Sequence, residues 1–175
     1  MSTGHFHFGS QLPEDFRIRT ERLDLIPSGS QLADTQSHEH TRLSQLLGAR
    51  IPNDWPPEMV VDRSSPEGAG WWNWYIVERQ TDDKVLIGTA GVKGWPSLSG
   101  SVQAGCAFLP QFQWQGYGTE AVRGLTSWLL SQPQIDRVIA DVPAANESSI
   151  RIVRKLGFDL SSSNDELLRF EKPKT

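Results

Sequence analysis

The chain has 175 residues, a formal net charge of −4 at pH 7 and one cysteine. This length suits a single domain with a sizeable core, and one cysteine excludes an internal disulfide. The mild acidity argues against nucleic-acid binding, and no apolar run approaches the ~20 residues of a membrane span. The N-terminus lacks the apolar core of a signal peptide, so we expect a cytoplasmic protein with no membrane partner.

The first half of the chain predicts mainly strands. Alternating residues and turn signals give the elements in order. They are a flexible N-terminal arm (1–16), a strand (18–26), one or two helices ended by Gly48 (29–47), a loop with a short helix near 57–62 (51–70), and two strands joined at 81–84 (74–78 and 85–92). Residues 17–175 are expected to form one domain.

The second half predicts two units of strand followed by helix. A strand from Ser101 to Leu109 ends before Pro110, and a helix then begins near residue 117. Its apolar residues recur at helical spacing, and they are Val122, Leu125, Trp128 and Leu129. Residues 137–142 predict a short buried strand.

The second helix has recognisable ends. Asn146 is a good N-cap, and Gly157 stands where a left-handed residue ends a helix. Residues 167–170 predict an edge strand. The order of the elements indicates an α/β fold, with a mixed, mostly antiparallel central sheet flanked by helices.

Two glycines mark the junction between the first strand and helix of this half. Gly116 and Gly118 stand at the expected helix start, where backbone N–H groups and the helix dipole favour an anion. This pattern indicates a site for a phosphate or pyrophosphate group.

These residues resemble the GNAT superfamily of N-acetyltransferases, and in particular its RimJ/RimL-like branch. The acetyl-CoA signature Gln/Arg-x-x-Gly-x-Gly/Ala is met by Gln113, Gly116 and Gly118, within the run 116–121. The later Asn-x-x-Ser and Lys-Leu-Gly-Phe motifs are met at 146–149 and 155–158, and the opening 18–23 is also typical of the branch. The resemblance covers roughly residues 18–170.

The resemblance implies acetyl-CoA as co-substrate, no metal, and a set of site residues. Backbone N–H groups of residues 113–119 receive the pyrophosphate, the backbone at Phe108 pairs with the pantetheine arm and polarises the thioester, and Asn146 bonds that arm. Ser149 is the expected catalytic acid, which protonates the departing sulfur. The implied cofactor-binding residues are Phe108, Gln113, Trp114, Gln115, Gly116, Tyr117, Gly118, Thr119, Asn146 and Ser149.

Two positions depart from the family pattern. Val153 stands where many members carry a tyrosine acid, which leaves Ser149 as the candidate. Gln103 stands where the branch often has glutamate, so no clear general base is present. A water chain to a more distant carboxylate such as Asp141 is one candidate.

The expected function is acetyl transfer to a primary amine by direct attack in a ternary complex. The amine, a small molecule or a protein N-terminus, stays open, as does the choice between monomer and homodimer. One alternative is a CoA-binding module with weak or no activity. Another is a dinucleotide-binding oxidoreductase, because Gly116-x-Gly118-x-x-Ala121 also fits that fingerprint and Asp141 could bind a ribose.

Other conspicuous side chains have both structural and functional interpretations. Tryptophans near the second strand, Trp71, Trp72 and Trp74, suit either the core or an acceptor pocket. Cys106 is expected to be a small buried apolar residue rather than a nucleophile. The histidines at 5, 7, 38 and 40 lack the partners of a metal site.

Overall fold

The structure is a computed structural model that describes residues 12–13, 15–28, 40–55, 73–93 and 99–175. In these ranges the strands are β1 (Ile18–Arg19), β2 (Leu23–Pro27), β3 (Asn73–Glu78), β4 (Val85–Lys93), β5 (Ser101–Phe108), β6 (Arg137–Pro143), β7 (Asp159–Ser163) and β8 (Leu167–Pro173). The helices are α2 (His40–Leu47), α3 (Tyr117–Ser131), α4 (Glu147–Lys155) and the short 3₁₀ helix η1 (Pro110–Phe112).

All eight strands form one sheet in the order β1-β2-β3-β4-β5-β6-β8-β7. Neighbouring strands are antiparallel except β5 and β6, which are parallel and are joined by the crossover through α3. The expected fold class, a mostly antiparallel mixed sheet with flanking helices, is confirmed. Among the described residues, no helix has the length and apolar character needed to span a membrane.

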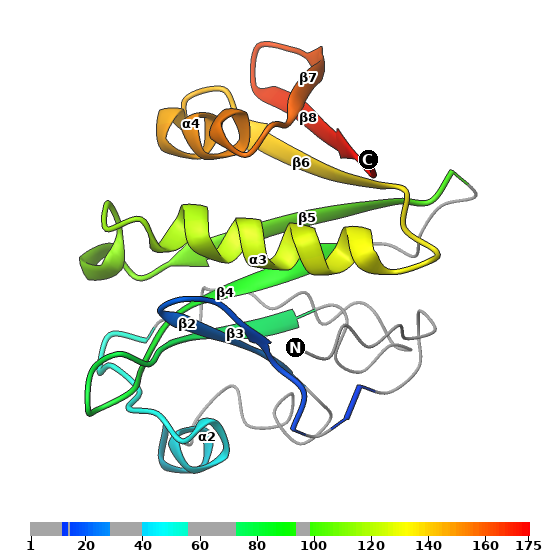
Figure 1. The fold of residues 1–175 in the computed structure, drawn as a ribbon. Helices are drawn as coiled ribbons and strands as arrows, with labels where there is room; N and C mark the ends of the chain where they lie inside the picture. Colours follow the sequence, from blue (N-terminus) through cyan, green and yellow to red (C-terminus); the bar gives the residue numbers. More distant parts are fainter. Residues whose placement is uncertain (1–11, 14, 29–39, 56–72, 94–98) are drawn as a thin grey trace.

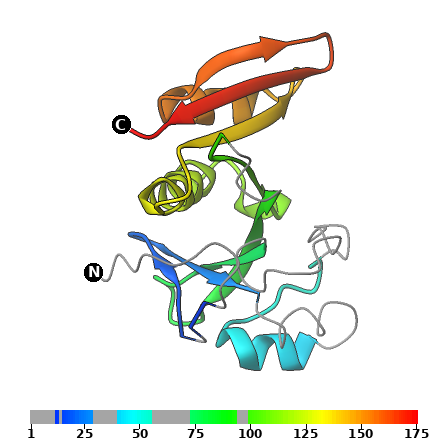
Figure 2. The same cartoon turned by 90° about the vertical axis from the view of Figure 1, so that its right-hand side faces the viewer.

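Helices cover the two faces of the sheet in different places. Figures 1 and 2 show α3 along the middle of the sheet, α4 beside the C-terminal strands and α2 at the other end of the molecule. The alternation of β3 explains the two layers, because Trp74 and Ile76 pack in the core with α3. Tyr75 and Val77 face the other way, into the second core with α2.

The sheet opens between β5 and β6. Only three residue pairs join these strands, from Ser101–Arg137 to Gln103–Ile139. Beyond them β5 continues to Phe108 along β4, and β6 continues to Pro143 along β8. Figure 1 shows the two strands converging at the right and separating toward the left, where α3 and α4 begin. The helices therefore start beside a split in the sheet.

Several predicted elements are present where the sequence placed them. The hairpin of β3 and β4, helix α2 followed by Gly48, and the crossover α3 all agree with the predicted order. Asn146 caps α4 through its side chain, and Gly157 adopts a left-handed φ of 79° after the helix. Residues 29–39 of the predicted helical region (29–47) and the short helix predicted near 57–62 lie outside the described residues.

The single strand predicted for residues 18–26 is wrong. The structure has two short strands, β1 and β2, which pair antiparallel around a turn at residues 20–22. The turn contains neither glycine nor proline, so the sequence carries no local signal for it. Thr20 closes it instead, because its backbone N–H donates to the carbonyl of Leu23 at 2.9 Å.

The prediction of an edge strand at 167–170 is also wrong. The strand there, β8, is longer and lies between β6 and β7, so β7 forms the edge. Strand β7 was not predicted, because its sequence Asp-Leu-Ser-Ser-Ser has no apolar alternation and all five residues are exposed. Pairing with β8, rather than burial of its own side chains, accounts for this strand.

The boundary of the N-terminal arm remains a prediction, since residues 1–11 and 14 lie outside the described part. Within that part Leu12 is buried in the core with α3. Phe16 packs against Trp74 and Trp128, with ring centroids 6.2 and 5.6 Å away.

The interior position of β8 can be tested with two paired residues. Phe170 is fully buried, whereas Leu160, opposite it on β7, is 49% exposed. We expect Phe170→Ala to lower the free energy of unfolding by about 3–5 kcal/mol, and Leu160→Ala by at most about 1 kcal/mol. Urea denaturation measures both changes. Equal losses in the two variants would contradict the assignment.

Candidate active site

The glycine loop lies between the end of β5 and the start of α3. After η1 the chain passes through Trp114, which has a positive φ of 63°, and Gly116, with a φ of 83°. A side chain at Gly116 would be strained, which explains the glycine there. Gly116 is the N-cap of α3 and has no side chain to cap it, so N–H groups of the first turn are available to an external acceptor.

Gly118 serves a different purpose from Gly116. A Cβ atom at this position would lie 3.0 Å from Cδ1 of Ile152 on α4 and 3.7 Å from a ring carbon of Phe108. The missing side chain therefore lets the first turn of α3 approach both α4 and the end of β5. This close approach narrows the space beside the loop.

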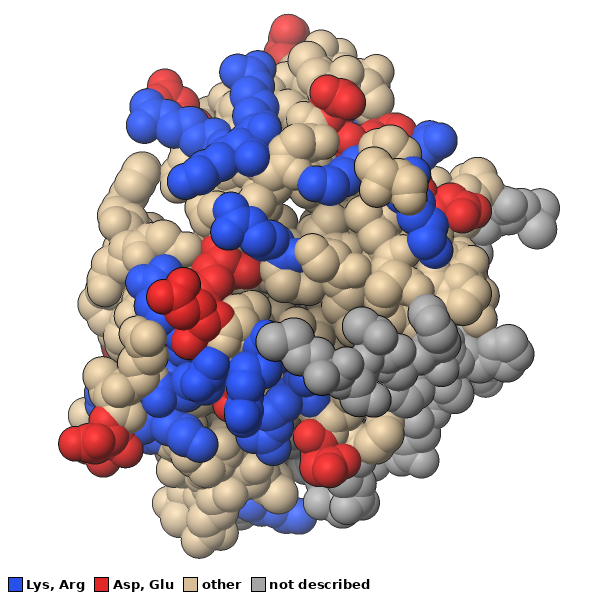
Figure 3. Space-filling model, viewed as in Figure 1, with Lys and Arg blue, Asp and Glu red and all other residues tan. Residues whose placement is uncertain are grey.

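Two neighbouring cavities lie beside this loop and in the split of the sheet. The inner one, of about 170 Å³, is enclosed by β5, β6, α3 and α4. The outer one, of about 530 Å³, follows the glycine loop and α4. They share Cys106, Asn146, Ser149 and Ile152. We call the two together the cleft; Figure 3 shows the surface hollowed beside α4.

The structure brings most of the predicted site residues together. The outer cavity is lined by Phe108, Gln113, Trp114, Gly116, Gly118, Thr119, Asn146 and Ser149. Gln115 and Tyr117 belong to the same loop but contact Arg22 on its other side. Trp114 is 80% exposed, so it extends from the rim of the cleft.

Phe108 and Gln113 are joined by a hydrogen bond. The side-chain amide of Gln113 donates to the backbone carbonyl of Phe108 at 3.1 Å. This bond closes the chain reversal between β5 and the glycine loop. Gln113 therefore has a structural function at the mouth of the cleft.

Helix α4 places its first turn in the cleft. Asn146 Oδ1 accepts a hydrogen bond from the backbone N–H of Ser149 at 3.1 Å, which fixes the N-terminus of the helix. Ser149 lines both cavities, so it lies where the inner and outer parts meet.

Sequence reasoning missed two basic residues of the cleft. Arg151 and Lys155 line the outer cavity on the same helix as Ser148 and Ile152. Arg151, Ile152 and Lys155 follow Ser148 by three, four and seven residues, which places all four on one face of a helix. This spacing is the signal that could have revealed the two basic residues. Figure 3 shows Lys and Arg side chains gathered over α4 on this face.

Cys106 lies on β5 where the two cavities meet. Its side chain is half-buried, and desolvation raises the pKa of the thiol to about 12. The thiol therefore stays protonated near neutral pH, which makes it a poor nucleophile. This agrees with the expectation that Cys106 is not a nucleophile, although the side chain is half-buried rather than buried.

Asp141 is held by an arginine on the neighbouring strand. Arg169 donates two hydrogen bonds to the carboxylate, at 2.7 and 2.8 Å. These bonds lower the pKa of Asp141 despite its partial burial, and the charges of Arg169 and Lys93 add to the effect. A carboxylate with a lowered pKa holds a proton weakly, so Asp141 is a poor general base.

Of the remaining candidates that the structure describes, none lines the cleft. Trp74 is buried to 1% exposure and packs on Trp128 at 5.1 Å, so it is a core residue. Trp71, Trp72, His5, His7 and His38 lie outside the described residues. Within the described ranges, His, Cys, Asp and Glu form no group of three that could hold a metal ion.

A sheet that splits beside a glycine loop at a helix N-terminus defines the class of GNAT acetyltransferases. The comparisons agree, since the family model described as "Acetyltransferase (GNAT) domain" matches residues 35–159. The chain belongs to this family, and it is an N-acetyltransferase. Enzymes of the family use acetyl-CoA.

The individual proteins that resemble this chain share between 12% and 27% of its sequence. The chain is 27% identical over 160 residues to "Uncharacterized N-acetyltransferase YjdG" of Bacillus subtilis (strain 168), covering 85% of this chain and 93% of that protein. An acetyltransferase (GNAT family) from Bacillus anthracis has a similar structure, with a TM-score of 0.63, 17% identity, and coverage of 91% and 99%. The structure of spermidine N-acetyltransferase from Vibrio cholerae in complex with CoA and spermine matches with a TM-score of 0.51 and 12% identity. The match covers 58% of this chain and 64% of that chain. The structural likenesses establish the fold.

The cofactor assignment of the cleft can be tested at Gly118. We expect Gly118→Glu to abolish acetyl-CoA binding measured by calorimetry, because a carboxylate introduced beside Ile152 and Phe108 would project into the outer cavity and repel a phosphate. The nearest atom is the end of a flexible side chain, so the fold should survive.

Ser127→Glu is the matched control for Gly118→Glu, because it adds the same charge to an exposed position of α3. It should leave acetyl-CoA affinity unchanged. A folded Gly118→Glu variant with the affinity of the unmodified protein would refute the assignment.

Proposed function

We propose that this protein is an enzyme of the RimJ/RimL-like branch that transfers an acetyl group from acetyl-CoA to a primary amine. The amine attacks directly in a ternary complex. The observation that carries the proposal is the cleft. Its outer cavity is lined by both the glycine loop and Ser149, and its inner cavity lies in the split between β5 and β6 and is also lined by Ser149.

The outer cavity suits the anionic part of CoA. Backbone N–H groups of the loop 113–119 and the dipole of α3 receive the pyrophosphate. Arg151 and Lys155 add two positive charges along the same cavity. These groups attract a polyanion even though the net charge of the whole chain is negative.

The inner cavity suits the pantetheine arm. Beyond Gln103, β5 has no ladder pairs with β6 among the described residues, so its backbone is available to an extended, amide-containing ligand. The ligand takes the place of a strand neighbour, with backbone groups around Phe108 beside the thioester. Asn146 bonds the arm while it continues to cap α4.

Ser149 donates the proton that the departing sulfur needs. In the reaction a bond forms between the amine nitrogen and the acetyl carbon, and the carbon–sulfur bond breaks. The hydroxyl proton of Ser149 passes to the thiolate. The proton that the attacking nitrogen loses passes to water and from water back to Ser149, which restores the hydroxyl. Val153 is buried at the position where many family members carry a tyrosine, so it supplies no acid.

The amine approaches from the face of the sheet opposite α3. Ala104 and Cys106 pack toward α3, whereas Gly105 and Ala107 alternate with them and are exposed on the other face. A Cβ atom on Gly105 would meet no described atom within 4 Å. The acceptor can thus be a small amine or a protein N-terminus. Trp71 and Trp72, the remaining candidates for an aromatic acceptor surface, lie outside the described residues.

A screen of amines tests this function directly. The unmodified protein is incubated with acetyl-CoA and a library of small amines and N-terminal peptides, and released thiol is measured. Amine-dependent thiol release supports the proposal. Binding of acetyl-CoA without release for any amine would support the alternative of a CoA-binding module. Binding of NAD in place of acetyl-CoA would support the oxidoreductase alternative, which membership of the GNAT family opposes.

Substitution of Ser149 tests its chemical role. If its hydroxyl protonates the thiolate, Ser149→Ala should lower kcat by ~10–10³-fold and leave the Kd for acetyl-CoA nearly unchanged. Ser127→Ala, on an exposed part of α3, is the control and should behave as the unmodified protein. If kcat is unchanged in Ser149→Ala while the chemical step limits the rate, Ser149 is not the acid and has only a structural role in α4.

The pH dependence tests the requirement for a free amine. We expect kcat/KM to rise from about pH 6 toward the pKa of the amine, because only the neutral amine attacks. The pKa values of Asp141 and Glu120 are lowered and that of Cys106 is raised to about 12, so none of these three groups titrates in that range. A flat profile would reject direct attack by a free amine.

A further inference from the structure

The first turn of α3 is tied to the β1–β2 turn, which lies 98 residues earlier in the chain. Glu120 accepts hydrogen bonds from the backbone N–H and the Nε of Arg22, both at 2.7 Å, and another from the hydroxyl of Thr20. Both charged side chains are largely buried, with 14% of Glu120 and 27% of Arg22 exposed. Partial burial raises the pKa of Glu120, but these bonds outweigh it and leave the pKa lowered.

The other end of Arg22 reaches the glycine loop. One terminal nitrogen donates to the backbone carbonyl of Gln115 at 3.0 Å, and the guanidinium lies over the ring of Tyr117 at 4.4 Å. A Cβ atom on Gly116 would lie 3.2 Å from the other terminal nitrogen. Arg22 therefore contacts Gln115 and Tyr117 and lies close to Gly116 between them.

These contacts determine the direction of one peptide group. In a planar trans peptide the C=O and the following N–H point in opposite directions. Because the carbonyl of Gln115 is turned toward Arg22, the N–H of Gly116 points away from Arg22. Gly116 lines the outer cavity together with Gly118 and Thr119. A reversed peptide would turn the carbonyl of Gln115 toward the cleft, where it would repel a phosphate.

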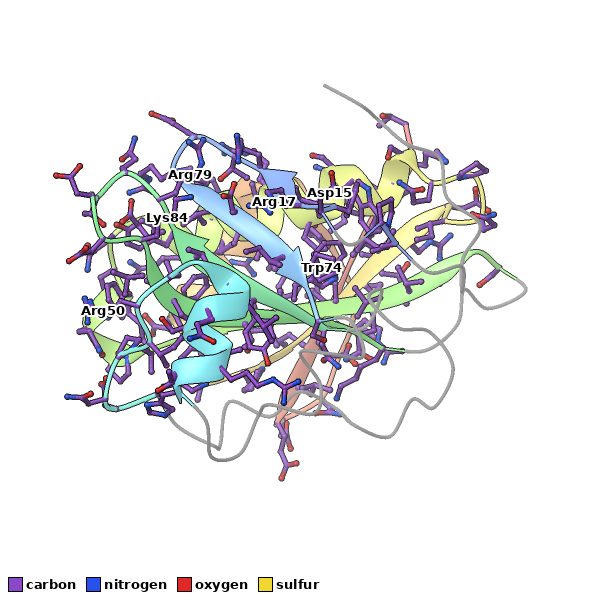
Figure 4. All side chains as sticks on the ribbon, turned by 90° about the horizontal axis from the view of Figure 1, so that it is seen from below. Asp15, Arg17, Arg50, Trp74, Arg79 and Lys84 are labelled. Carbon is purple, nitrogen blue, oxygen red and sulfur yellow. The ribbon has the colours of Figure 1, made fainter. Side chains whose placement is uncertain are left out.

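The β1–β2 turn, which carries Arg22, is held by further contacts of its own. Arg79 on the chain after β3 donates to the carbonyl of Glu21 at 3.0 Å and to that of Thr20. Asp24, buried to 1% exposure, pairs with Arg19 at 3.0 Å and with Arg79 at 3.5 Å. Figure 4 shows Arg17 and Arg79 beside this part of the sheet. The turn thus offers a rigid support for the loop.

We propose that Arg22 and Glu120 form a latch that fixes the glycine loop in the orientation that binds the pyrophosphate of CoA. This inference rests on the proposed function. Arg22 is a positioning residue in it, since it acts through the peptide between Gln115 and Gly116. The latch makes affinity for the phosphate end of CoA depend on the β1–β2 turn, while affinity for the pantetheine end does not.

Two probes separate positioning of the loop from general loss of structure. Acetyl-CoA carries the pyrophosphate, whereas S-acetylpantetheine lacks it. For Arg22→Ala we expect the Kd for acetyl-CoA, measured by calorimetry, to rise about tenfold or more. The Kd for S-acetylpantetheine should stay within about twofold of that of the unmodified protein, because the inner cavity is lined by other residues.

Three further variants test the latch. Arg22→Lys keeps the charge but cannot bridge Glu120 and Gln115 with a planar fork, so it should resemble Arg22→Ala. Glu120→Gln should weaken acetyl-CoA binding in the same selective way. Arg123→Ala removes the same charge from an exposed position of α3 and should leave both Kd values unchanged.

The results separate a latch from simple charge attraction and from a general loss of structure. An unchanged Kd for acetyl-CoA in Arg22→Ala, or an equal loss for both probes, would overturn the latch. If Arg22→Lys binds acetyl-CoA as tightly as the unmodified protein, the latch is also overturned, because the positive charge alone then accounts for the affinity. If Arg22→Ala does not fold, Glu120→Gln and Arg22→Lys provide the same comparison. Failure of the unmodified protein to bind acetyl-CoA would refute the proposed function itself, so the two failures are distinct.

Discussion

The rest of the structure depends on the separation of β5 from β6. Each strand keeps its other neighbour, β4 for β5 and β8 for β6, so both stay rigid after their shared ladder ends at Gln103. The separation leaves backbone groups without strand partners, and buried backbone groups require hydrogen bonds from another source. An extended ligand with amide groups can supply them. In the binding mode that we propose, the backbone of the sheet supplies the polar contacts, which agrees with an inner cavity lined mostly by small or apolar residues.

Charge is distributed to suit this arrangement. The chain as a whole is acidic, yet the outer cavity combines the N-terminus of α3 with Arg151 and Lys155 of α4. Glu120 also lies in the first turn of α3, but it is bonded to Arg22 and Thr20 rather than facing the cavity. An anionic ligand therefore meets N–H groups and cations. Net charge describes long-range attraction, whereas local placement decides what the cleft accepts.

Local sequence signals predicted the second half of the fold well. The alternation of β5, the apolar stripe of α3 and the ends of α4 at Asn146 and Gly157 all act within a few residues of chain. The failures concern tertiary contacts. The turn at 20–22 is stabilised by Glu120, and β7 exists because β8 pairs with it. Arg151 and Lys155 belong to the cleft only because α4 packs beside the glycine loop, which no single segment of sequence reveals.

The cleft holds few groups that can exchange protons near neutral pH. Burial keeps the thiol of Cys106 protonated, and Arg169 keeps Asp141 ionised and weakly basic. In the reaction that we propose, most of the catalytic effect comes from position, because the cleft brings a reactive thioester and a neutral amine together. Precision then depends on the rigid parts around the cleft, namely the paired strands, the cap of α4 and the loop before α3. The contacts that orient these parts, such as those of Arg22 and Asn146, are therefore as important for the reaction as any group that touches the substrate.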